Sequence, residues 1–172
     1  MDTADLYVDA MFAWAMDGNW DIRAYQQGKG TSDGLTSKEA KKYAEGLESF
    51  ISSSPRWNGG VTYRGVNISD VSEYKPGKII DQKGLSSWSS SLDVAKGFTL
   101  PTGGKRGASA QKVIFVSPTQ NKGTSINHLS PFGQSGQILP PQDEVLVSSS
   151  ASYAVGKTQR KDGYLFVYLE ET

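Results

Sequence analysis

Three short polar segments stand in a fixed order along the chain, and their residue types complement one another. They are residues 62–65 (Thr-Tyr-Arg-Gly), 84–89 (Gly-Leu-Ser-Ser-Trp-Ser) and 142–146 (Gln-Asp-Glu-Val-Leu). In turn they supply a guanidinium that suits a phosphate, a row of hydroxyls and a carboxylate. A carboxylate stabilises the oxocarbenium-like transition state of glycosidic cleavage, so the combination suits the cleavage of that bond in a dinucleotide.

The position of each segment in a strand makes this chemistry possible. Arg64 lies at the exit of a predicted strand, and the missing side chain of Gly65 would let a ligand approach the backbone. Alternate serines of residues 86–91 would point to one face of a strand. Gln142 and Glu144 lie two residues apart and therefore on the same face. Taken singly, these segments would be a surface ion pair, an exposed edge strand and an exposed turn, so only the combination favours a catalytic site.

Composition bounds the class of protein. The 172 residues and 18.6 kDa fit one domain, which we expect to divide into a helical preface at 1–59 and a β-rich core at 60–172. Eighteen basic and eighteen acidic residues cancel, so no global field favours nucleic acid or anionic lipid. The N-terminus lacks the basic region of a signal peptide, and its apolar stretch is too short for a bilayer. We expect a soluble monomer made in the cytosol, with no membrane partner.

Other kinds of site are excluded by what the sequence lacks. Cysteine is absent, which removes disulfides, thiolate nucleophiles and zinc–cysteine sites. His128 is the only histidine and has no Asp, Glu or His at ligand spacing, so neither a metal site nor a Ser-His-Asp hydrolase is expected. Residues 103–105 (Gly-Gly-Lys) do not match a P-loop, which disfavours ATP chemistry.

Two helices are predicted in the first third of the chain. Residues 3–16 are densely apolar and predict a largely buried helix, which the Asp-Gly-Asn turn at 17–19 would end. Thr36 and Glu39 form a capping-box pattern that begins the second helix, and residues 52–55 (Ser-Ser-Ser-Pro) end it. Its apolar face would consist of Ala40, Tyr43, Ala44, Leu47, Phe50 and Ile51.

Short β-branched and aromatic runs follow from Gly60 onward, separated by Gly, Pro, Ser and Asn clusters. Strands are predicted at residues 61–66, 85–89, 112–116, 124–127, 144–148, 153–157 and 164–169, with one short helix at 92–98. Helices first and many short strands later indicate an α+β domain with mainly antiparallel sheets. Two long irregular stretches, 99–111 and 128–141, are expected to be functional loops.

The three segments together resemble the mono-ADP-ribosyltransferases of the Arg-Ser-Glu class, which includes bacterial toxins, bacteriophage enzymes and vertebrate ecto-enzymes. Their pattern is an arginine at a strand end, an aromatic-x-Ser-x-Ser strand, and Glu-x-Glu or Gln-x-Glu before hydrophobic residues. Ala95 and Phe98 resemble the Ala-x-x-Phe that follows the serine motif, and residues 150–155 resemble the strand after the glutamate motif. Leu85 and Trp88 depart from the aromatic and the threonine that are frequent at their places.

The serine motif can be read in two registers, 87–89 or 89–91, and the placement of Ala95 and Phe98 favours the first. The resemblance implies two roughly perpendicular sheets that form a cleft for NAD+, the co-substrate. It places Arg64 on the phosphates and the Gly65 backbone near the nicotinamide amide. Glu144 would bind the nicotinamide-ribose hydroxyl, held in place by Ser87. Further cofactor contacts would come from Trp88, Ser89, Phe98 and Arg106.

Gln142 is the residue that indicates which chemical group accepts the ADP-ribose. In arginine-modifying relatives glutamate stands at this place, whereas glutamine cannot act as a base but can hydrogen-bond an amide, a hydroxyl or a base edge. The resemblance therefore implies a non-arginine acceptor: asparagine, glutamine, threonine or a guanine base. Phe132 and Gln134, in the loop before Gln142, are the expected target contacts. Lys105 or Arg106 would reach a phosphate or belong to a solvated basic loop.

The expected function is that of an NAD+-dependent mono-ADP-ribosyltransferase that marks a host macromolecule, with protein favoured over nucleic acid. It would act in the host or target-cell cytosol as a toxin, effector or bacteriophage enzyme. An NAD glycohydrolase, with water as acceptor, would use the same Arg64, Ser87 and Glu144. A non-catalytic NAD-binding or interaction module is disfavoured because competent residues fill all three motif positions.

Overall fold

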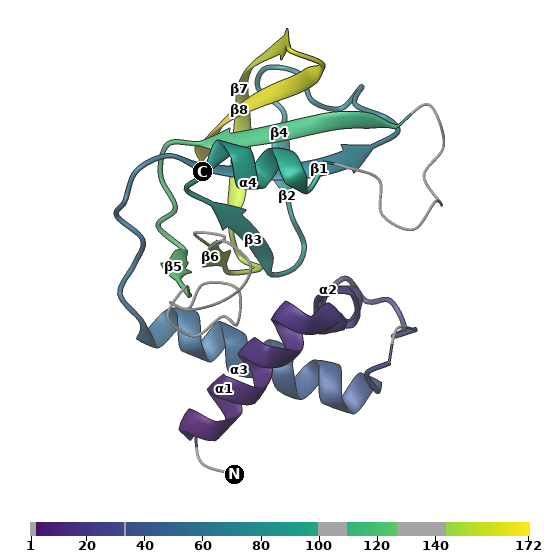
Figure 1. Cartoon of the computed structure of the whole chain (residues 1–172), viewed down its shortest axis with the longest axis vertical. Coiled ribbons are helices and arrows are strands. Elements are labelled where there is room, and N and C mark those ends of the chain that lie inside the picture. The colour runs from purple at the N-terminus through teal and green to yellow at the C-terminus, as the bar shows by residue number, and fades with distance from the viewer. Residues whose placement is uncertain (1–2, 33, 100–109, 127–143) are drawn as a thin grey trace.

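The computed structural model describes residues 3–32, 34–99, 110–126 and 144–172. Helices α1 (Thr3–Ala13), α2 (Asn19–Gln26) and α3 (Ser37–Ser53) form a layer on one side of the molecule, and the strands lie on the other (Figure 1). The short helix α4 (Leu92–Gly97) packs on the strands, far from this layer. Within these described residues, none of the helices has the length and apolar character needed to traverse a membrane.

The first helix does not end at the predicted turn. It passes through the π-helix η1 (Trp14–Gly18) directly into α2, so the turn predicted at 17–19 is wrong. Glycine is needed here because a Cβ at Gly18 would overlap the carbonyl of Ala13. The side-chain amide of Asn19 donates to the carbonyl oxygen of Trp14 at 2.9 Å. The local sequence therefore builds a widened helical turn in place of a chain reversal.

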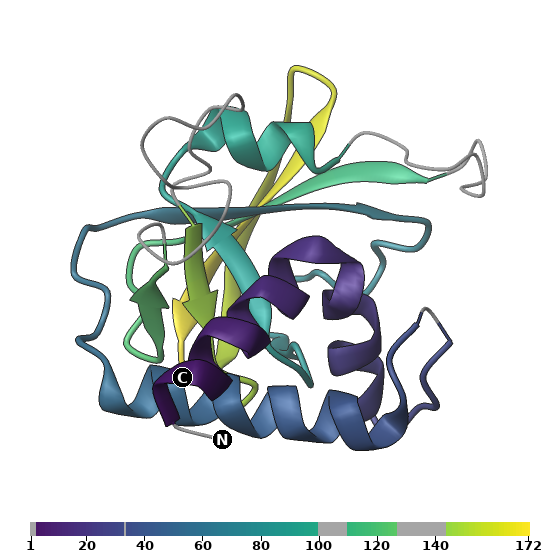
Figure 2. The same cartoon turned by 60° about the horizontal axis from the view of Figure 1, so that its bottom comes forward.

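Burial of α1 is also less than predicted. Only Ala10 and Met11 are buried, whereas the side chains of Val8 and Phe12 are exposed. The expectation of a largely buried helix is wrong because α1 packs along one side only, against α3. Figure 2 shows α1 running obliquely to α3, which lies along the bottom of that view.

Helix α3 confirms its prediction. The Thr36 hydroxyl accepts from the Glu39 amide while the Glu39 carboxylate accepts from the Thr36 amide, which completes the capping box. Gly46 lets α1 approach, since a Cβ there would meet Leu6 at 3.2 Å. The face buried by this packing is Ala40, Ala44, Gly46, Leu47, Phe50 and Ile51.

In the described part of the chain, eight strands form one sheet in the order β2-β7-β8-β4-β1-β3-β6-β5. Their bounds are β1 Thr62–Ile68, β2 Ile79–Asp81, β3 Ser86–Ser89, β4 Gln111–Ser117, β5 Gly123–Ser125, β6 Glu144–Val147, β7 Ser152–Lys161 and β8 Tyr164–Glu171. All neighbours pair antiparallel except β4 and β8. The α+β class and the seven predicted strands are confirmed, and β2 is an addition. The division into two sheets is not confirmed, because pairing joins all eight strands.

The sheet is joined weakly between β1 and β3. Strand β1 pairs with β4 along its whole length, but with β3 only at Tyr63 and Ser89. Strand β3 therefore diverges from β1 and runs between that junction and the helical layer (Figures 1 and 2). This divergence brings the serine strand close to the N-terminal helices.

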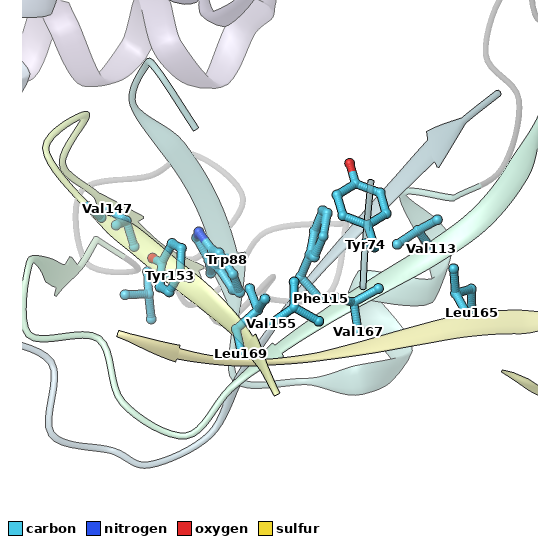
Figure 3. Close-up of a cluster of buried hydrophobic side chains, with 12 residues drawn as sticks. Tyr74, Trp88, Val113, Phe115, Val147, Tyr153, Val155, Leu165, Val167 and Leu169 are labelled. Atoms are coloured by element: carbon cyan, nitrogen blue, oxygen red, sulfur yellow. The ribbon is translucent and has the colours of Figure 1, made fainter. Parts of the chain in front are cut away.

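Two apolar clusters lie on opposite faces of β3 and β6. The first, which we call the sheet core, encloses Trp88 with Val147, Phe115 and Tyr153 (Figure 3). The second, the interlayer core, joins the helical layer to the strands through Leu85 and Leu146. Side chains alternate along a strand, so Ser87 and Glu144 share the face of Leu85 and Leu146 and point toward the helices.

Candidate functional site

Ser87 and Glu144 meet on the face of the sheet that is turned toward the helical layer. The register of β3 and β6 pairs Ser89 with Glu144, so Ser87 is a diagonal neighbour within reach of a long side chain. The Ser87 hydroxyl donates to Glu144 Oε2 at 2.5 Å, a length typical of a hydroxyl bound to a carboxylate. Ser87 is thus a residue of the serine run whose hydroxyl contacts Glu144, and its role in catalysis stays a prediction. We call these residues the Ser87/Glu144 pair.

Glu144 is buried, with 8% of the residue's surface exposed. Burial raises its pKa above the ordinary value of 4.5, and hydrogen bonds from Ser87 and Trp14 act in the opposite direction. The two donors therefore favour the charged form in surroundings that disfavour it. A carboxylate held in this way interacts strongly with any positive charge that develops beside it.

Trp14 joins this group from the helical layer. Its indole Nε1 donates to Ser87 Oγ at 2.8 Å, and only 3% of the side chain is exposed. Its sequence context does not distinguish Trp14, because a tryptophan in an apolar helix is usually core packing. The available signal was its polar N–H, which needs a partner when the ring is buried.

Arg64 approaches the same serine from β1. Its Nη1 donates to the Ser87 carbonyl oxygen at 3.0 Å across the gap between the diverging strands. The side chain is half-buried, and its Nε is enclosed without a hydrogen-bond partner. Burial, together with the nearby charge of Arg23, lowers the pKa of Arg64 to about 9. The guanidinium therefore remains a cation at neutral pH.

Arg23 of α2 provides a second positive charge that the sequence did not reveal. It is half-buried, its Nε is also enclosed without a partner, and burial lowers its pKa. Among the residues the structure describes, no carboxylate forms an ion pair with Arg23 or Arg64. Two neighbouring guanidinium groups that no carboxylate of the described ranges neutralises form a site suited to an anion with more than one charge.

The glycine after the arginine serves a different purpose from the one expected. A Cβ at Gly65 would overlap the carbonyl oxygen of Ala95 and lie 3.1 Å from Thr99 Cγ2. Its missing side chain thus makes room for α4 and the residues that follow it. The contact between its backbone and a nicotinamide amide stays a prediction.

Three other residues that are expected to contact the cofactor lie in surroundings that differ from one another. Trp88 is 1% exposed in the sheet core, where its indole donates to Ser86 Oγ at 2.9 Å, so the expected cofactor contact is wrong (Figure 3). Alternation along β3 turns it away from the Ser87/Glu144 pair. Ser89 is buried, and its hydroxyl accepts from the Ser91 amide. Phe98, at the end of α4, is 52% exposed and accessible to a ligand.

The remaining sequence-predicted positions lie outside the described residues: Lys105, Arg106, His128, Phe132, Gln134 and Gln142. Within the described ranges no group of His, Asp or Glu has the arrangement of a metal site. Two surface hollows of about 380 and 330 Å³ are lined by other residues than Arg64, Ser87 and Glu144. The side-chain constellation, and not either hollow, defines the candidate site.

Comparisons with known proteins agree with this geometry at the level of the fold. No protein-family model and no curated protein matches the sequence. Among solved structures, the Vis toxin, an ADP-ribosyltransferase from Vibrio splendidus, matches with a TM-score of 0.73 and 20% identity over 96% of this chain and 72% of that one. Exoenzyme S from Pseudomonas aeruginosa, in complex with human 14-3-3 protein beta and carba-NAD, gives 0.71 and 19% over 98% and 74%.

A third solved structure has the same fold at a lower sequence identity. The Clostridium limosum C3 exoenzyme aligns with a TM-score of 0.62 and 14% identity over 97% of this chain and 85% of that one. The chain therefore has the fold of the ADP-ribosyltransferases.

Proposed function

We propose that this chain is an NAD+-dependent mono-ADP-ribosyltransferase that acts on a macromolecule of a host or target cell. The observation that carries the proposal is the buried Ser87/Glu144 pair, whose serine is bonded through its carbonyl to Arg64. The fold supports it, and so does the carba-NAD bound in the exoenzyme S complex. NAD+ contains the two groups that this site suits, a diphosphate and a ribose joined to a good leaving group.

The cationic pair Arg23 and Arg64 would hold the diphosphate. Each guanidinium offers a planar fork of donors, and each has an enclosed Nε without a partner in the described structure. A diphosphate would relieve the repulsion between the two cations. Phe98 and the Gly65 backbone are proposed as further contacts to the co-substrate.

The chemical step uses Glu144. As the bond between ribose C1′ and the nicotinamide nitrogen breaks, its electron pair leaves with nicotinamide and positive charge develops on the ribose. The Glu144 carboxylate, fixed by Ser87, stabilises that charge in surroundings with little competing water. The acceptor nucleophile then attacks C1′ and loses its proton. Removal of such a fixed charge typically lowers the rate by ~10²–10³-fold.

The acceptor and target are proposed from the sequence. Gln142 favours a non-arginine acceptor because an amide hydrogen-bonds but does not act as a base. Phe132 and Gln134 are proposed to contact the target. A protein target is favoured by the balanced charge of the chain and by the protein bound to exoenzyme S. We further propose that residues 1–172 form one monomeric domain that acts in the cytosol of the target cell.

The test measures two products at once. The protein is incubated with a cell lysate and NAD+ labelled on the adenylate, and free nicotinamide and macromolecule-bound label are both quantified. We expect stoichiometric release and labelling, both lost in Glu144→Gln. Nicotinamide release without labelling would instead establish an NAD glycohydrolase. Equal labelling by wild type and Glu144→Gln, or no binding of NAD+ in calorimetry, would contradict the proposal.

A further inference from the structure

The hydroxyl of Ser87 takes part in two hydrogen bonds that come from different layers of the molecule. The indole Nε1 of Trp14 donates to Ser87 Oγ at 2.8 Å, and Ser87 Oγ donates to Glu144 Oε2 at 2.5 Å. All three side chains lie between the helical layer and the strands. The indole, hydroxyl and carboxylate thus form a continuous chain of hydrogen bonds.

The chemistry of the three groups fixes the direction of this chain. An indole nitrogen can only donate, and an ionised carboxylate can only accept. The serine hydroxyl has one proton and two lone pairs. Because the Trp14 indole donates to one lone pair of the Ser87 oxygen, the Ser87 proton is directed to Glu144. We propose that Trp14 is a positioning residue that sets the direction of the Ser87 hydroxyl and thereby holds the Glu144 carboxylate in its reactive orientation. This inference rests on the proposed role of Glu144 in the cleavage of NAD+.

The backbone around Trp14 is built to hold the indole in place. Trp14 is the first residue of the π-helix η1, a kind of turn that is rare and frequently found at functional sites. Gly18 permits the turn by its lack of a side chain, and Asn19 anchors the carbonyl oxygen of Trp14 at 2.9 Å. The ring itself is enclosed in the interlayer core together with Met11 and Ile22. A side chain held at both its backbone and its ring loses little entropy when it orients a hydroxyl.

Ser87 is also fixed on its main chain, because its carbonyl oxygen accepts from Arg64. Trp14 and Arg64 therefore act on different atoms of the same residue. The hydrogen bonds that Ser87 and Trp14 contribute both lower the pKa of Glu144 against the effect of burial, and the Trp14 indole makes its contribution from its place on the Ser87 hydroxyl. Loss of the indole donor should therefore raise the pKa of Glu144. Among the described residues, the charged groups beside Ser87 are Arg64 and, next to it, Arg23, together with Glu144 itself, and both arginines remain in a Trp14 variant.

Trp14→Phe tests the proposal because it keeps an aromatic ring and removes the donor. We expect kcat for nicotinamide release to fall about tenfold, less than the loss from a group that touches substrate. KM for NAD+ should stay within about twofold, since the diphosphate contacts are unchanged. The acid limb of the kcat–pH profile should move to higher pH. Trp20→Phe is the matched control: Trp20 is 53% exposed in α2, and its replacement should change none of these quantities.

A double-mutant cycle separates positioning from a general effect on the fold. If Trp14 acts through Ser87, then Trp14→Phe should have little further effect on nicotinamide release in a Ser87→Ala background. Additive effects would overturn the proposal, as would an unchanged kcat and pH profile in a folded Trp14→Phe variant. Should that variant fail to fold, Asn19→Ala, which frees only the backbone anchor, is expected to shift the same profile in the same direction.

A readout that is independent of turnover keeps this inference apart from the proposed function. The titration of Glu144 can be followed by carbon NMR with ¹³C-labelled glutamate, assigned by the signal missing in Glu144→Gln. We expect a higher pKa for Glu144 in Trp14→Phe and no change in Trp20→Phe. An unchanged titration in Trp14→Phe would overturn the inference even in an active enzyme. Failure of wild type to cleave NAD+ would overturn the proposed function while the expected NMR shift would still show the hydrogen-bond chain.

Discussion

Glu144→Gln is the substitution whose effects the structure defines most sharply. Glutamine has nearly the same shape, and its carbonyl oxygen can still accept from Ser87, but it carries no charge. The rate of nicotinamide release should fall by about 10²–10³-fold, because the charge that stabilises the developing cation is removed. The same substitution should change stability in a way that depends on pH.

The sign of that dependence follows from burial. Desolvation raises the folded-state pKa of Glu144 above 4.5, so between 4.5 and the folded-state value the folded protein keeps a proton that the unfolded chain has lost. Wild type therefore loses stability as pH rises through this window, by up to about 1.4 kcal/mol per pH unit for one proton. Glu144→Gln has no such titration. Its stability relative to wild type should be constant below pH 4.5, increase through the window and become constant again above it.

The assay is urea unfolding of both proteins at a series of pH values from 4 to 8, with the difference in unfolding free energy plotted against pH. The pH dependence of this difference tests the prediction. A difference that does not change with pH would reflect only how the amide of the glutamine packs. Glu45→Gln, at an exposed position of α3, controls for the loss of a negative charge as such. A flat difference for Glu144→Gln, or one that falls with pH, would refute the reasoning from burial. An unchanged rate would refute the role in catalysis.

Two further predictions concern the cationic pair and the packing of α4. Arg23→Gln should raise KM for NAD+ about tenfold in steady-state nicotinamide release while kcat changes less, since a diphosphate contact is lost beside an intact Arg64; an unchanged KM would exclude Arg23 from the site. Gly65→Ala should lower the free energy of unfolding in urea by about 3 kcal/mol, because its Cβ would overlap the Ala95 carbonyl. Gly30→Ala, where a Cβ meets nothing within 4 Å, is the control, and equal losses would contradict the packing argument.

The strand part of the site could be predicted because its geometry is local. Residues two apart on a strand share a face, so Ser87 could be assigned from its motif and Glu144 from the start of its strand. The pairing of β3 with β6 then brings the two side chains together. Both strands are short and begin within polar segments that are easy to recognise in the sequence. Their approximate bounds could therefore be predicted as well.

The helical part could not be predicted, because it depends on how two layers dock. Trp14 reaches Ser87 across 73 positions of sequence. Arg23 comes near Arg64 because α2 packs against residues 84 and 85, which lead into β3. Neither residue has a local pattern that distinguishes it from ordinary packing or surface charge. The prediction of a turn from the Asp-Gly-Asn segment at 17–19 is wrong for a related reason. Glycine permits a tight turn, but at Gly18 it permits a close approach of the backbone within a continuous helical segment.

The departure of this sequence from the serine-motif pattern has a structural explanation. Trp88 occupies a place where threonine is frequent in the enzymes that the chain resembles. Its side chain fills the sheet core, with ring centroids 5.4 Å from Tyr153 and 6.5 Å from Phe115. Because neighbouring residues of a strand point to opposite faces, the packing of Trp88 anchors β3 from behind while Ser87 faces Glu144. The residue at this place is therefore constrained by the volume of the sheet core, and its side chain faces away from the Ser87/Glu144 pair.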